Sequence, residues 1–581
     1  MKFPSLTELN TSREIIDTFG GYNHNLRIGD GEFYDMKNLT SADYPVLSPR
    51  PKRGVYPSVD NPQGLIAKDT LSYVDGADFV INDYRVNMGL SVAENDCPKT
   101  LLSMGAYVII MPDKKYINTA DVTDFGNIEA TVETTSDVSF ELCKLDGSAY
   151  SEAYKGDAAP ESPENMDLWI DTSSTPHTLK QYSSTSANWT AIATTYIKIT
   201  SVGLGKPFEV GDGVTISGIE IDALKDLNST MVIWEKGDDY IVVIGMLDSI
   251  QTTTTPITVT RRMPNLDFII ESENRLWGCR YGYAVNGEVV NEIYASKLGD
   301  FKNWNSFAGV STDSYVATVG TDGQFTGAVT HLGYPIFFKE NCMHKVYGNY
   351  PANYQIQTTA CRGVQRGCNK SLAIVNETLY YKSRSAVCAY DGSLPVEISA
   401  PLGEVNYSDA VAGVLGNKYY ISMADGNGVS HLFVYDTHRG LWHREDNTKV
   451  KDFCNCRGEL YYIDSGNKIK TVIGKGDAVE QGDVEWMAET GIIGLDSPDK
   501  KYVSRIDIRL SMTVGARVFV HIQYDSGGDW EQVYAMTGIN LRSFAIPIRP
   551  KRCDHIRIRI SGWGESKIYS ICKTIEQGSD I

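Results

Sequence analysis

One short stretch of the chain contains the residue types that bind metal ions. It holds His431, His438 and His443, with Asp436 and Asp446 close by. A zinc site needs such ligands at spacings that bring four of them together. The spacing here is irregular, and histidines in strands and turns are more often surface or hydrogen-bonded core groups. We therefore predict no metal site in this stretch.

A cysteine pair and an acidic turn are two further candidates for metal binding. Cys454 and Cys456 would point to one face of a strand, but a four-ligand site needs a second pair, and no other spacing in the sequence supplies it. Asp30, Glu32 and Asp35 lie in a polar turn that lacks the ligand spacing of a calcium loop. We interpret both features as structural and predict no metal and no cofactor.

One motif points to glycan chemistry. Asp525 to Trp530, DSGGDW, fits part of the Asp box of sialidase-type propellers, with Gln523 where the motif has Ser or Thr. In those families the Asp box is a hairpin turn remote from the reacting groups. Catalysis of that type needs an arginine cluster and a nucleophilic tyrosine, and no motif here identifies them. A phosphate-binding glycine loop and a nucleophile elbow are also missing from the sequence, so we predict that the protein is not an enzyme.

The composition indicates a large all-β protein. A length of 581 residues predicts two or three domains, and 42% apolar with 22% charged residues is typical of a globular protein. The 52 glycines and 34 tyrosines favour short strands joined by tight turns. We expect all-β architecture, with a single short helix over Ser12 to Thr18.

Charge and cysteine usage limit the partners and the compartment. A net charge of −19 argues against a protein that wraps nucleic acid by neutralising its phosphates. The eleven scattered cysteines predict reduced thiols. No apolar run is long enough to span a bilayer, and the start MKFPSLTELN has no signal-peptide core. We therefore expect synthesis in a cytoplasm and no membrane span.

A recurring pair of strands is the clearest internal pattern. Four copies begin near Ile336, Leu379, Tyr419 and Leu460, about 40 residues apart, which is the length of one four-stranded propeller blade. One looser copy begins at Asn274, and another lies near the N-terminus. Tyr240 to Ile244 is a further apolar strand that we assign to a blade. Together these segments predict five to seven blades. A closed propeller removes the exposed sheet edges that promote aggregation.

Two regions depart from this pattern. Asp124 to Tyr196 is rich in Ser, Thr and Pro, and we expect a small inserted β module in which Trp169, Tyr182 and Trp189 contact a partner. From about Lys501 the residues alternate apolar and charged, which predicts a β-sandwich. The expected domains are an N-terminal arm with the first blades (1–123), the inserted module (124–196), the remaining blades (197–480) and the C-terminal sandwich (485–581).

The sandwich differs in charge from the rest of the chain. Lys501 to Ile560 contains ten Lys and Arg residues against five Asp and Glu. Alternate residues of a strand share a face, so we expect a cationic row that contacts an acidic partner. The alternative is an ordinary solvated face. The row comprises Arg549, Lys551, Arg552, Arg557 and Arg559.

Two segments resemble a known family. Phe19 to Gly54, FGGYNHNLRIGDGEFYDMKNLTSADYPVLSPRPKRG, resembles the opening of tail nozzle, tail hub or stabilisation proteins of short-tailed bacteriophages. Glu273 to Phe307, ENRLWGCRYGYAVNGEVVNEIYASKLGDFKNWNSF, looks like a blade that these proteins share. Trp169 to Tyr182 is similar to small modules spread through phage tail genes.

The resemblance implies a virion protein without enzymatic activity. Such a protein is a propeller-based subunit of a homo-oligomeric ring, most often a hexamer, below the portal and adaptor, and viral double-stranded DNA leaves through it without sequence-specific binding. The acidic charge fits a channel wall to which DNA does not adhere. Two alternatives stay open: a virion receptor module that binds glycans through its aromatic residues, and a propeller glycan hydrolase.

Overall fold

The structure is a computed structural model. It describes residues 11–57, 59–93, 97–284, 287–475, 478–479, 481–495, 500–538, 540–549 and 551–577. Strands dominate these residues, and the helices described among them are short 3-10 turns. No helix in the described ranges is long and apolar enough to cross a membrane.

The chain divides into two compact units. Unit 1 comprises Met1–Leu101, Phe338–Met343 and Thr359–Ile581, and unit 2 comprises Leu102–Phe337 and His344–Thr358. Seven four-stranded sheets in the described chain have the strand number of propeller blades, as the sequence predicts. Four of them are formed by β7 (Pro62–Ala67), β8 (Leu71–Asp75), β9 (Asp78–Ile81), β10 (Tyr84–Asn87), β36 (Ala373–Val375), β37 (Thr378–Lys382), β38 (Val387–Tyr390), β39 (Val396–Glu397), β40 (Ser408–Leu415), β41 (Lys418–Ala424), β42 (Ser430–Asp436), β43 (Leu441–Arg444), β44 (Val450–Cys456), β45 (Glu459–Asp464), β46 (Ile469–Thr471) and β6 (Gly54–Val55). The others are formed by β11 (Thr100–Met104), β12 (Tyr107–Met111), β13 (Lys115–Asn118), β14 (Phe125–Asn127), β28 (Phe268–Ser272), β29 (Arg275–Tyr283), β30 (Val289–Ala295), β31 (Tyr315–Thr318), β32 (Gly327–His331), β33 (Tyr334–Lys339), β34 (Cys342–Tyr347) and β35 (Gln355–Ala360).

The four aligned copies of the predicted repeat each correspond to one strand in four of these sheets. These strands are β33, β37, β41 and β45, each the second strand of its sheet. The inner strands are buried on both faces, as in β41 with Tyr419, Tyr420 and Ile421, so neighbouring blades pack face to face. In unit 1, β36 contacts β40, β40 contacts β44, and β44 contacts β7.

An N-terminal strand completes one blade. The two residues of β6 pair antiparallel with β46, Val55 opposite Lys470 and Gly54 opposite Thr471. The backbones approach so closely that a Cβ atom on Gly54 would lie 2.5 Å from Thr471 Oγ1. A strand from the beginning of the chain therefore supplies the outer edge of a blade that is otherwise built from residues 450–471.

The inserted module is larger than the sequence suggests. Two sheets, β15-β27-β22-β23 and β24-β25-β21-β16-β26, enclose a core that includes Phe140, Ile199, Phe208 and Val259, and a third sheet has the order β17-β18-β19-β20. We expected the insertion to end at 196 and Tyr240–Ile244 to belong to a blade, but that strand pairs with β21 of the module, and the last module strand ends at Arg261. A short apolar run fits a buried strand in either place. The module strands are β15 (Ala130–Glu133), β16 (Val138–Cys143), β17 (Ala153–Gly156), β18 (Leu168–Asp171), β19 (Thr178–Ser183), β20 (Asn188–Ala191), β21 (Tyr196–Thr200), β22 (Gly213–Ser217), β23 (Thr230–Val232), β24 (Glu235–Lys236), β25 (Tyr240–Ile244), β26 (Gln251–Thr253) and β27 (Thr258–Arg261).

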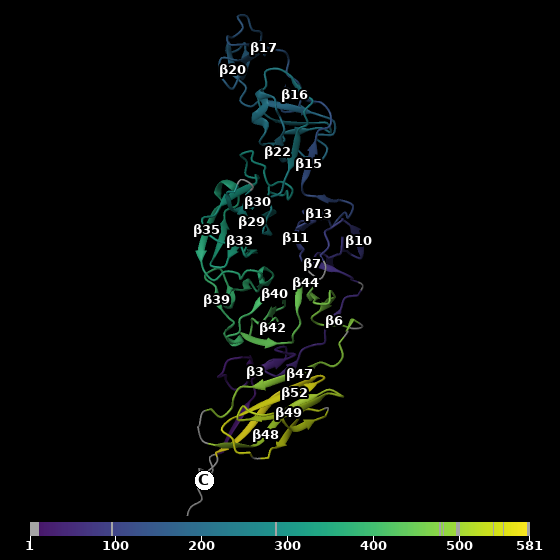
Figure 1. Cartoon of the computed structure of the whole chain (residues 1–581), viewed down its shortest axis with the longest axis vertical. Helices are drawn as coiled ribbons and strands as arrows, with labels where there is room; N and C mark the ends of the chain where they lie inside the picture. Colours follow the sequence, from purple (N-terminus) through teal and green to yellow (C-terminus); the bar gives the residue numbers. More distant parts are fainter. Residues whose placement is uncertain are drawn as a thin grey trace, which may run out of the picture. The chain divides into compact units, whose positions relative to one another are not determined.

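The sandwich of unit 1 combines both ends of the chain (Figure 1). Its sheets have the orders β1-β53-β48-β51 and β2-β3-β47-β52-β49-β50. The expected helix over Ser12 to Thr18 is wrong, because these residues begin in β1, which pairs along its whole length with β53. The strands are β1 (Thr11–Ile16), β2 (Gly21–Tyr22), β3 (Glu32–Lys37), β47 (Glu485–Thr490), β48 (Lys501–Met512), β49 (Arg517–Tyr524), β50 (Glu531–Met536), β51 (Arg542–Pro547), β52 (Ile556–Trp563) and β53 (Ser566–Gln577), with the pair β4 (Leu39–Thr40) and β5 (Ser48–Pro49) beside them in the chain.

We predict that Gly54→Ala destabilises the propeller, because the added methyl group must displace Thr471 from the β6–β46 pair. The expected loss is about 1–3 kcal/mol in the free energy of unfolding, measured by calorimetry on the full chain. Gly426→Ala is the matched control, since a Cβ atom there meets no atom within 4 Å. Equal unfolding temperatures for the two variants would show that the β6 strand contributes nothing to stability.

Candidate functional site

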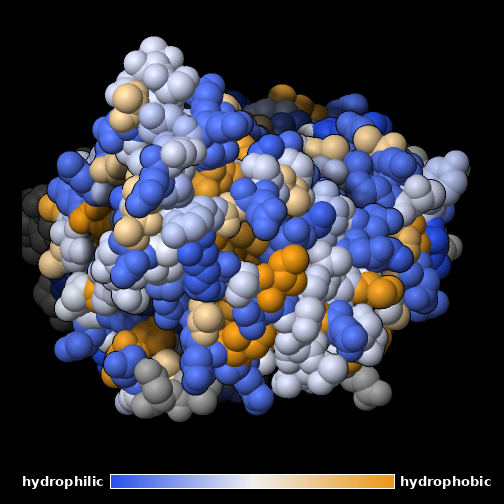
Figure 2. All heavy atoms as spheres, turned by 90° about the horizontal axis from the view of Figure 1, so that it is seen from above, coloured by the Kyte–Doolittle hydropathy of each residue, from blue (hydrophilic) through white to orange (hydrophobic). Residues whose placement is uncertain are grey.

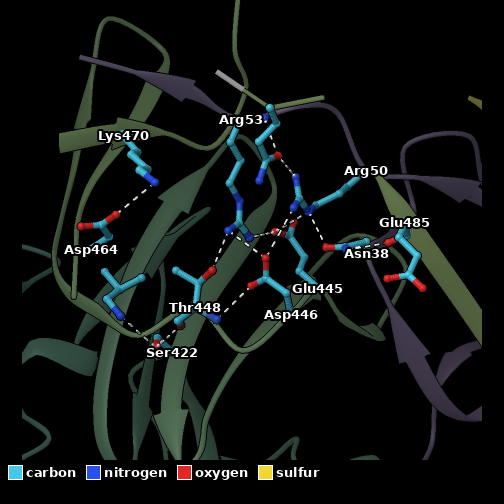
Figure 3. Close-up of polar contacts among 12 residues, drawn as sticks. Asn38, Arg50, Arg53, Ser422, Glu445, Asp446, Thr448, Asp464, Lys470 and Glu485 are labelled. Carbon is cyan, nitrogen blue, oxygen red and sulfur yellow. Dashed lines mark hydrogen bonds and ion pairs between the residues drawn. The ribbon is translucent and has the colours of Figure 1, made fainter. Parts of the chain in front are cut away.

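Two arginines of the N-terminal arm, Arg50 and Arg53, take part in a buried cluster of charged side chains. The side chains of Arg50 and Arg53 are 3% and 4% exposed, and that of Glu445 is 4% exposed. Arg53 donates to Glu445 Oε2 at 2.7 Å and lies 2.9 Å from Asp446 Oδ2 (Figure 3). Arg50 lies 3.6 Å from Glu445 and 3.4 Å from Asp446. Two buried cations thus face two carboxylates of the segment that joins β43 to β44.

The same cluster extends to the sandwich. Arg50 Nε donates to Asn38 Oδ1 at 2.8 Å, and Asn38 Nδ2 donates to the carbonyl of Glu485, the first residue of β47, at 2.7 Å. Gln481 Oε1 accepts from Arg50 Nη1 and from the Arg53 amide, each at 3.0 Å. We call this set the arm joint: Asn38, Arg50, Arg53, Glu445, Asp446, Gln481 and Glu485. It connects the arm, two blades, Gln481 between β46 and β47, and the sandwich.

The opposite charges of the arm joint stabilise Arg53 and Asp446, whereas burial and the neighbouring Arg53 lower the pKa of Arg50. Burial acts to raise the pKa of Asp446, but Arg53, the Thr448 hydroxyl and Arg50 outweigh it, so the pKa lies below its usual value. Burial likewise acts against the charge of Arg53, and Glu445 and Asp446 compensate, so the pKa of Arg53 lies above its usual value. Each ion is therefore stable in the interior only while its partners are present.

A glycine of the family-like segment is also explained by this packing. Gly21 has a φ of +82°, and a side chain there would collide with the carbonyl oxygen of Trp442 on β43. Only glycine combines this conformation with this close approach. Gly21 of the Gly20-Gly21 pair therefore serves the contact between arm and blade.

We predict that Arg53→Met lowers the free energy of unfolding by about 3–5 kcal/mol, because Glu445 remains buried with fewer partners. Thermal unfolding of the full chain measures this loss. The double variant R53M/E445M should recover part of it, since the unpaired carboxylate is gone. Lys52→Met, at a side chain 38% exposed, is the control. If R53M and K52M unfold at the same temperature, the arm joint does not stabilise the fold.

The predicted cationic row divides into two parts. Arg557 and Arg559 share one face of β52, as alternation predicts, but both pair with Glu489 of the neighbouring strand, at 3.3 Å and 2.8 Å. Their guanidinium groups also lie over the rings of Tyr34 and Trp530. These two arginines therefore have partners within the sandwich.

The other three cations lie outside the strands. Arg549, Lys551 and Arg552 are exposed in the segment that joins β51 to β52. Lys551 pairs with Glu531 at 3.0 Å, with both side chains 55% exposed, so this pair is weak. The exposed cations of the predicted row therefore lie in this segment rather than along β52.

The three aromatic residues predicted in the insertion come together on its small sheet. The ring centroids of Trp169 and Trp189 are 5.5 Å apart, and those of Tyr182 and Trp189 are 5.3 Å apart. Trp169 is only 6% exposed, and its Nε1 donates to the Gly156 carbonyl at 2.9 Å. Trp169 therefore supports the two half-buried members of the cluster, Tyr182 and Trp189.

The histidines considered for metal binding have separate environments. His431 Nε2 lies 3.0 Å from Asp425, His438 is exposed, and His443 is 4% exposed. Burial, with Lys418 nearby, lowers the pKa of His443 to about 3, so its imidazole is neutral at neutral pH. Across the described residues, no group of three His, Cys, Asp or Glu side chains is arranged to hold a metal ion.

The remaining sequence candidates also have structural partners. Asp30 pairs with Lys573 at 2.8 Å, and Asp35 pairs with Arg444 at 2.8 Å. Glu32 accepts from Asn23 and from the Gly29 amide. The DSGGDW motif forms the turn between β49 and β50, where Asp525 Oδ1 accepts the Asp554 amide at 2.7 Å. Each of these carboxylates therefore has a contact within the fold.

We predict that His443 makes the protein less stable in acid. Its pKa is about 3 when folded and about 6.5 when unfolded, so between these values the unfolded chain binds the extra proton. The free energy of unfolding then falls as pH decreases from about 6.5, by at most about 1.4 kcal/mol per unit from this group. His443→Gln should flatten the pH profile of thermal unfolding, whereas the exposed control His438→Gln should not. Parallel pH profiles for the wild type and H443Q would exclude His443 as the cause of the loss of stability in acid.

Comparisons with known proteins found solved structures of low sequence identity and no family. No protein-family model and no curated protein matches the chain. An exo-β-1,3-galactanase from Phanerochaete chrysosporium is 9% identical with a TM-score of 0.20, covering 52% of this chain and 95% of the other. A surface component of the Porphyromonas gingivalis type-IX secretion system is 11% identical with a TM-score of 0.26, and the match covers 90% of this chain and 71% of the other. A mutant Trypanosoma rangeli sialidase with trans-sialidase activity is 9% identical with a TM-score of 0.23, and the match covers 90% of this chain and 97% of the other.

Proposed function

We propose that the protein is a structural subunit of a bacteriophage tail, a nozzle or hub protein that forms a homo-oligomeric ring below the portal and adaptor. By the resemblance, the ring is a hexamer and viral double-stranded DNA passes through it during ejection. The protein would then act in the virion, after synthesis in the host cytoplasm, as a scaffold without catalytic activity.

The arm joint is the observation that carries this proposal. Phe19 to Gly54, the segment that resembles the tail proteins, contains Asn38, Arg50 and Arg53 of the joint and the glycine that packs against Trp442. The residues behind the resemblance therefore serve to connect the propeller to the sandwich. A segment whose side chains fix the relation between two domains fits a load-transmitting subunit better than a diffusing enzyme.

The net charge supports the same role. A chain of charge −19 repels the phosphate backbone, so DNA would move past such a surface without binding it. The exposed cations Arg549, Lys551 and Arg552 would then serve a protein contact rather than DNA. An acidic neighbour in the tail is the partner that complements them.

We predict that Arg549→Glu/Arg552→Glu weakens ring assembly or docking to tail proteins more at low than at high salt, since exposed charges are screened over about 10 Å at 0.1 M. Electron microscopy and sedimentation of the protein with its neighbouring tail proteins measure assembly. Arg517→Glu/Arg542→Glu is the control, because it makes the same charge change at exposed positions elsewhere in the sandwich.

Two results would count against the proposal. Antibodies against the protein that fail to label the tail of intact virions would exclude the structural role. If both double variants weaken assembly equally, the docking role of Arg549 and Arg552 is excluded, but the structural role of the protein is not. Arg557 and Arg559 are left unchanged in this design, because reversing them would place two new carboxylates beside the buried Glu489.

The aromatic cluster of the insertion favours a second candidate function, glycan binding. Aromatic rings on the outside of an appended module suit a receptor module on the virion surface. A propeller glycan hydrolase is the related alternative, tested by measuring whether reducing ends are released from oligosaccharides incubated with the protein.

A further inference from the structure

The small sheet of the insertion has one aromatic face. In its register Tyr154 is opposite Trp169, Trp169 is opposite Lys180, and Tyr182 is opposite Trp189. Residues opposite each other, and residues two apart in one strand, share a face. Tyr154, Trp169, Lys180, Tyr182 and Trp189 therefore lie on the same side of the sheet, and we call this side the aromatic face.

The other side of the sheet packs against the module. Leu168, Ile170 and Leu179 form a small core there, with Leu142 and Met246 from outside the sheet packed against it. The aromatic face consequently points away from this core. Tyr154 is 53% exposed, and Tyr182 and Trp189 are half-buried. Figure 2, viewed from the top of Figure 1 where β17 and β20 are drawn, shows a largely hydrophilic surface with separate hydrophobic patches.

The rings are fixed before any ligand binds. Trp189 packs edge-on against Trp169, with ring planes 70° apart, and is tilted by 55° against Tyr182. Lys180 Nζ lies 4.7 Å from the Trp169 ring centroid and 2.7 Å from Asp171 Oδ2. Hydrogen bonds from Lys180 and Ser173 lower the pKa of Asp171 to about 2, so this ion pair stays charged at neutral pH. A preorganised face loses little conformational entropy when a ligand binds.

This combination of groups suits a sugar. A pyranose ring has flat C–H faces that pack on aromatic rings by dispersion, and hydroxyl groups around its edge that need hydrogen-bond partners. Tyr154 and Tyr182 supply both a ring and a hydroxyl, and Lys180 adds a cationic donor next to the carboxylate of Asp171. Flat apolar surfaces alternating with donors and acceptors therefore match an oligosaccharide.

The size of the face argues against a protein partner. Four short strands span about 14 Å across and about 17 Å along the strands, an area on the order of 250 Å². A stable protein interface buries about 800 Å² on each partner. A short oligosaccharide can occupy the whole aromatic face, whereas a protein would need additional surface around it.

We propose that the aromatic face is a carbohydrate-binding site for oligosaccharides of pyranose units, with Trp189, Tyr182 and Tyr154 as stacking residues and Trp169 as their support. This inference rests on the second candidate function and is independent of the ring proposal. It names the ligand class and the residues that bind it.

Titration of the full chain with maltohexaose, cellohexaose and chitohexaose tests this site, by tryptophan fluorescence and saturation-transfer NMR. We expect at least one oligosaccharide to bind at millimolar or lower concentration. Trp189→Ala and Tyr154→Ala should each weaken its binding, W189A by about tenfold or more, which corresponds to about 1.4 kcal/mol. Trp189→Phe should retain most of the affinity, because the ring is kept.

Matched controls separate the outcomes. Trp563→Ala removes a tryptophan that is 40% exposed on the sandwich and should leave binding unchanged. Because Tyr154 is an exposed edge-strand residue, Y154A tests the site even if W189A unfolds the sheet. Binding that both variants leave intact overturns this site but not glycan recognition by the protein. If the wild-type protein binds none of the three sugars, both the proposed site and glycan recognition are overturned. If W189A and Y154A lose ring assembly and no sugar binds, the aromatic face is a protein contact instead.

Discussion

The buried pairing of Arg50 and Arg53 with Glu445 and Asp446 is the constraint on which the rest of unit 1 depends. An ion transferred from water into the interior loses several kcal/mol of solvation, so none of these four charges is stable there alone. The arm must reach the segment between β43 and β44 for either side to be neutralised. This requirement places Gly54 next to β46, and it places Asn38 next to β47. One electrostatic cluster thereby lies between the edge of a blade at Gly54 and the start of β47 in the sandwich.

The arm joint also explains why the arm has so little regular structure. Between β3 and β6 its residues form only the short β4–β5 pair, and side chains rather than a backbone ladder supply much of its attachment. Such side-chain contacts have a strict geometry, since an arginine presents its donors in a fixed plane. Attachment through side chains defines a single arrangement of arm and blade, whereas a short strand pair alone can slip in register.

The sequence predicted the features that depend on local pattern and missed those that depend on distant partners. The repeat at β33, β37, β41 and β45 was visible because each strand carries its own apolar run. The strand at Thr11–Ile16 was not, since its partner β53 lies more than 500 residues away and the local pattern is also compatible with a helix. Alternation placed Arg557 and Arg559 on one face correctly, but Glu489 could not be identified as their partner without the strand order. The basic run PRPKRG was the available signal for the arm joint, and nothing in it indicated burial.

The pairing of β1 with β53 has a consequence for biosynthesis. The ribosome makes β1 well before its partner β53, which emerges only after several hundred further residues have been translated. At about 5–20 residues per second, the roughly 550 residues in between take about half a minute to two minutes. During that time the nascent arm must wait with open hydrogen-bonding edges and unpaired arginines while blades form behind it. Its polar, charged sequence in TSREIID suits this delay, because such a segment stays hydrated and does not aggregate before the last strand arrives.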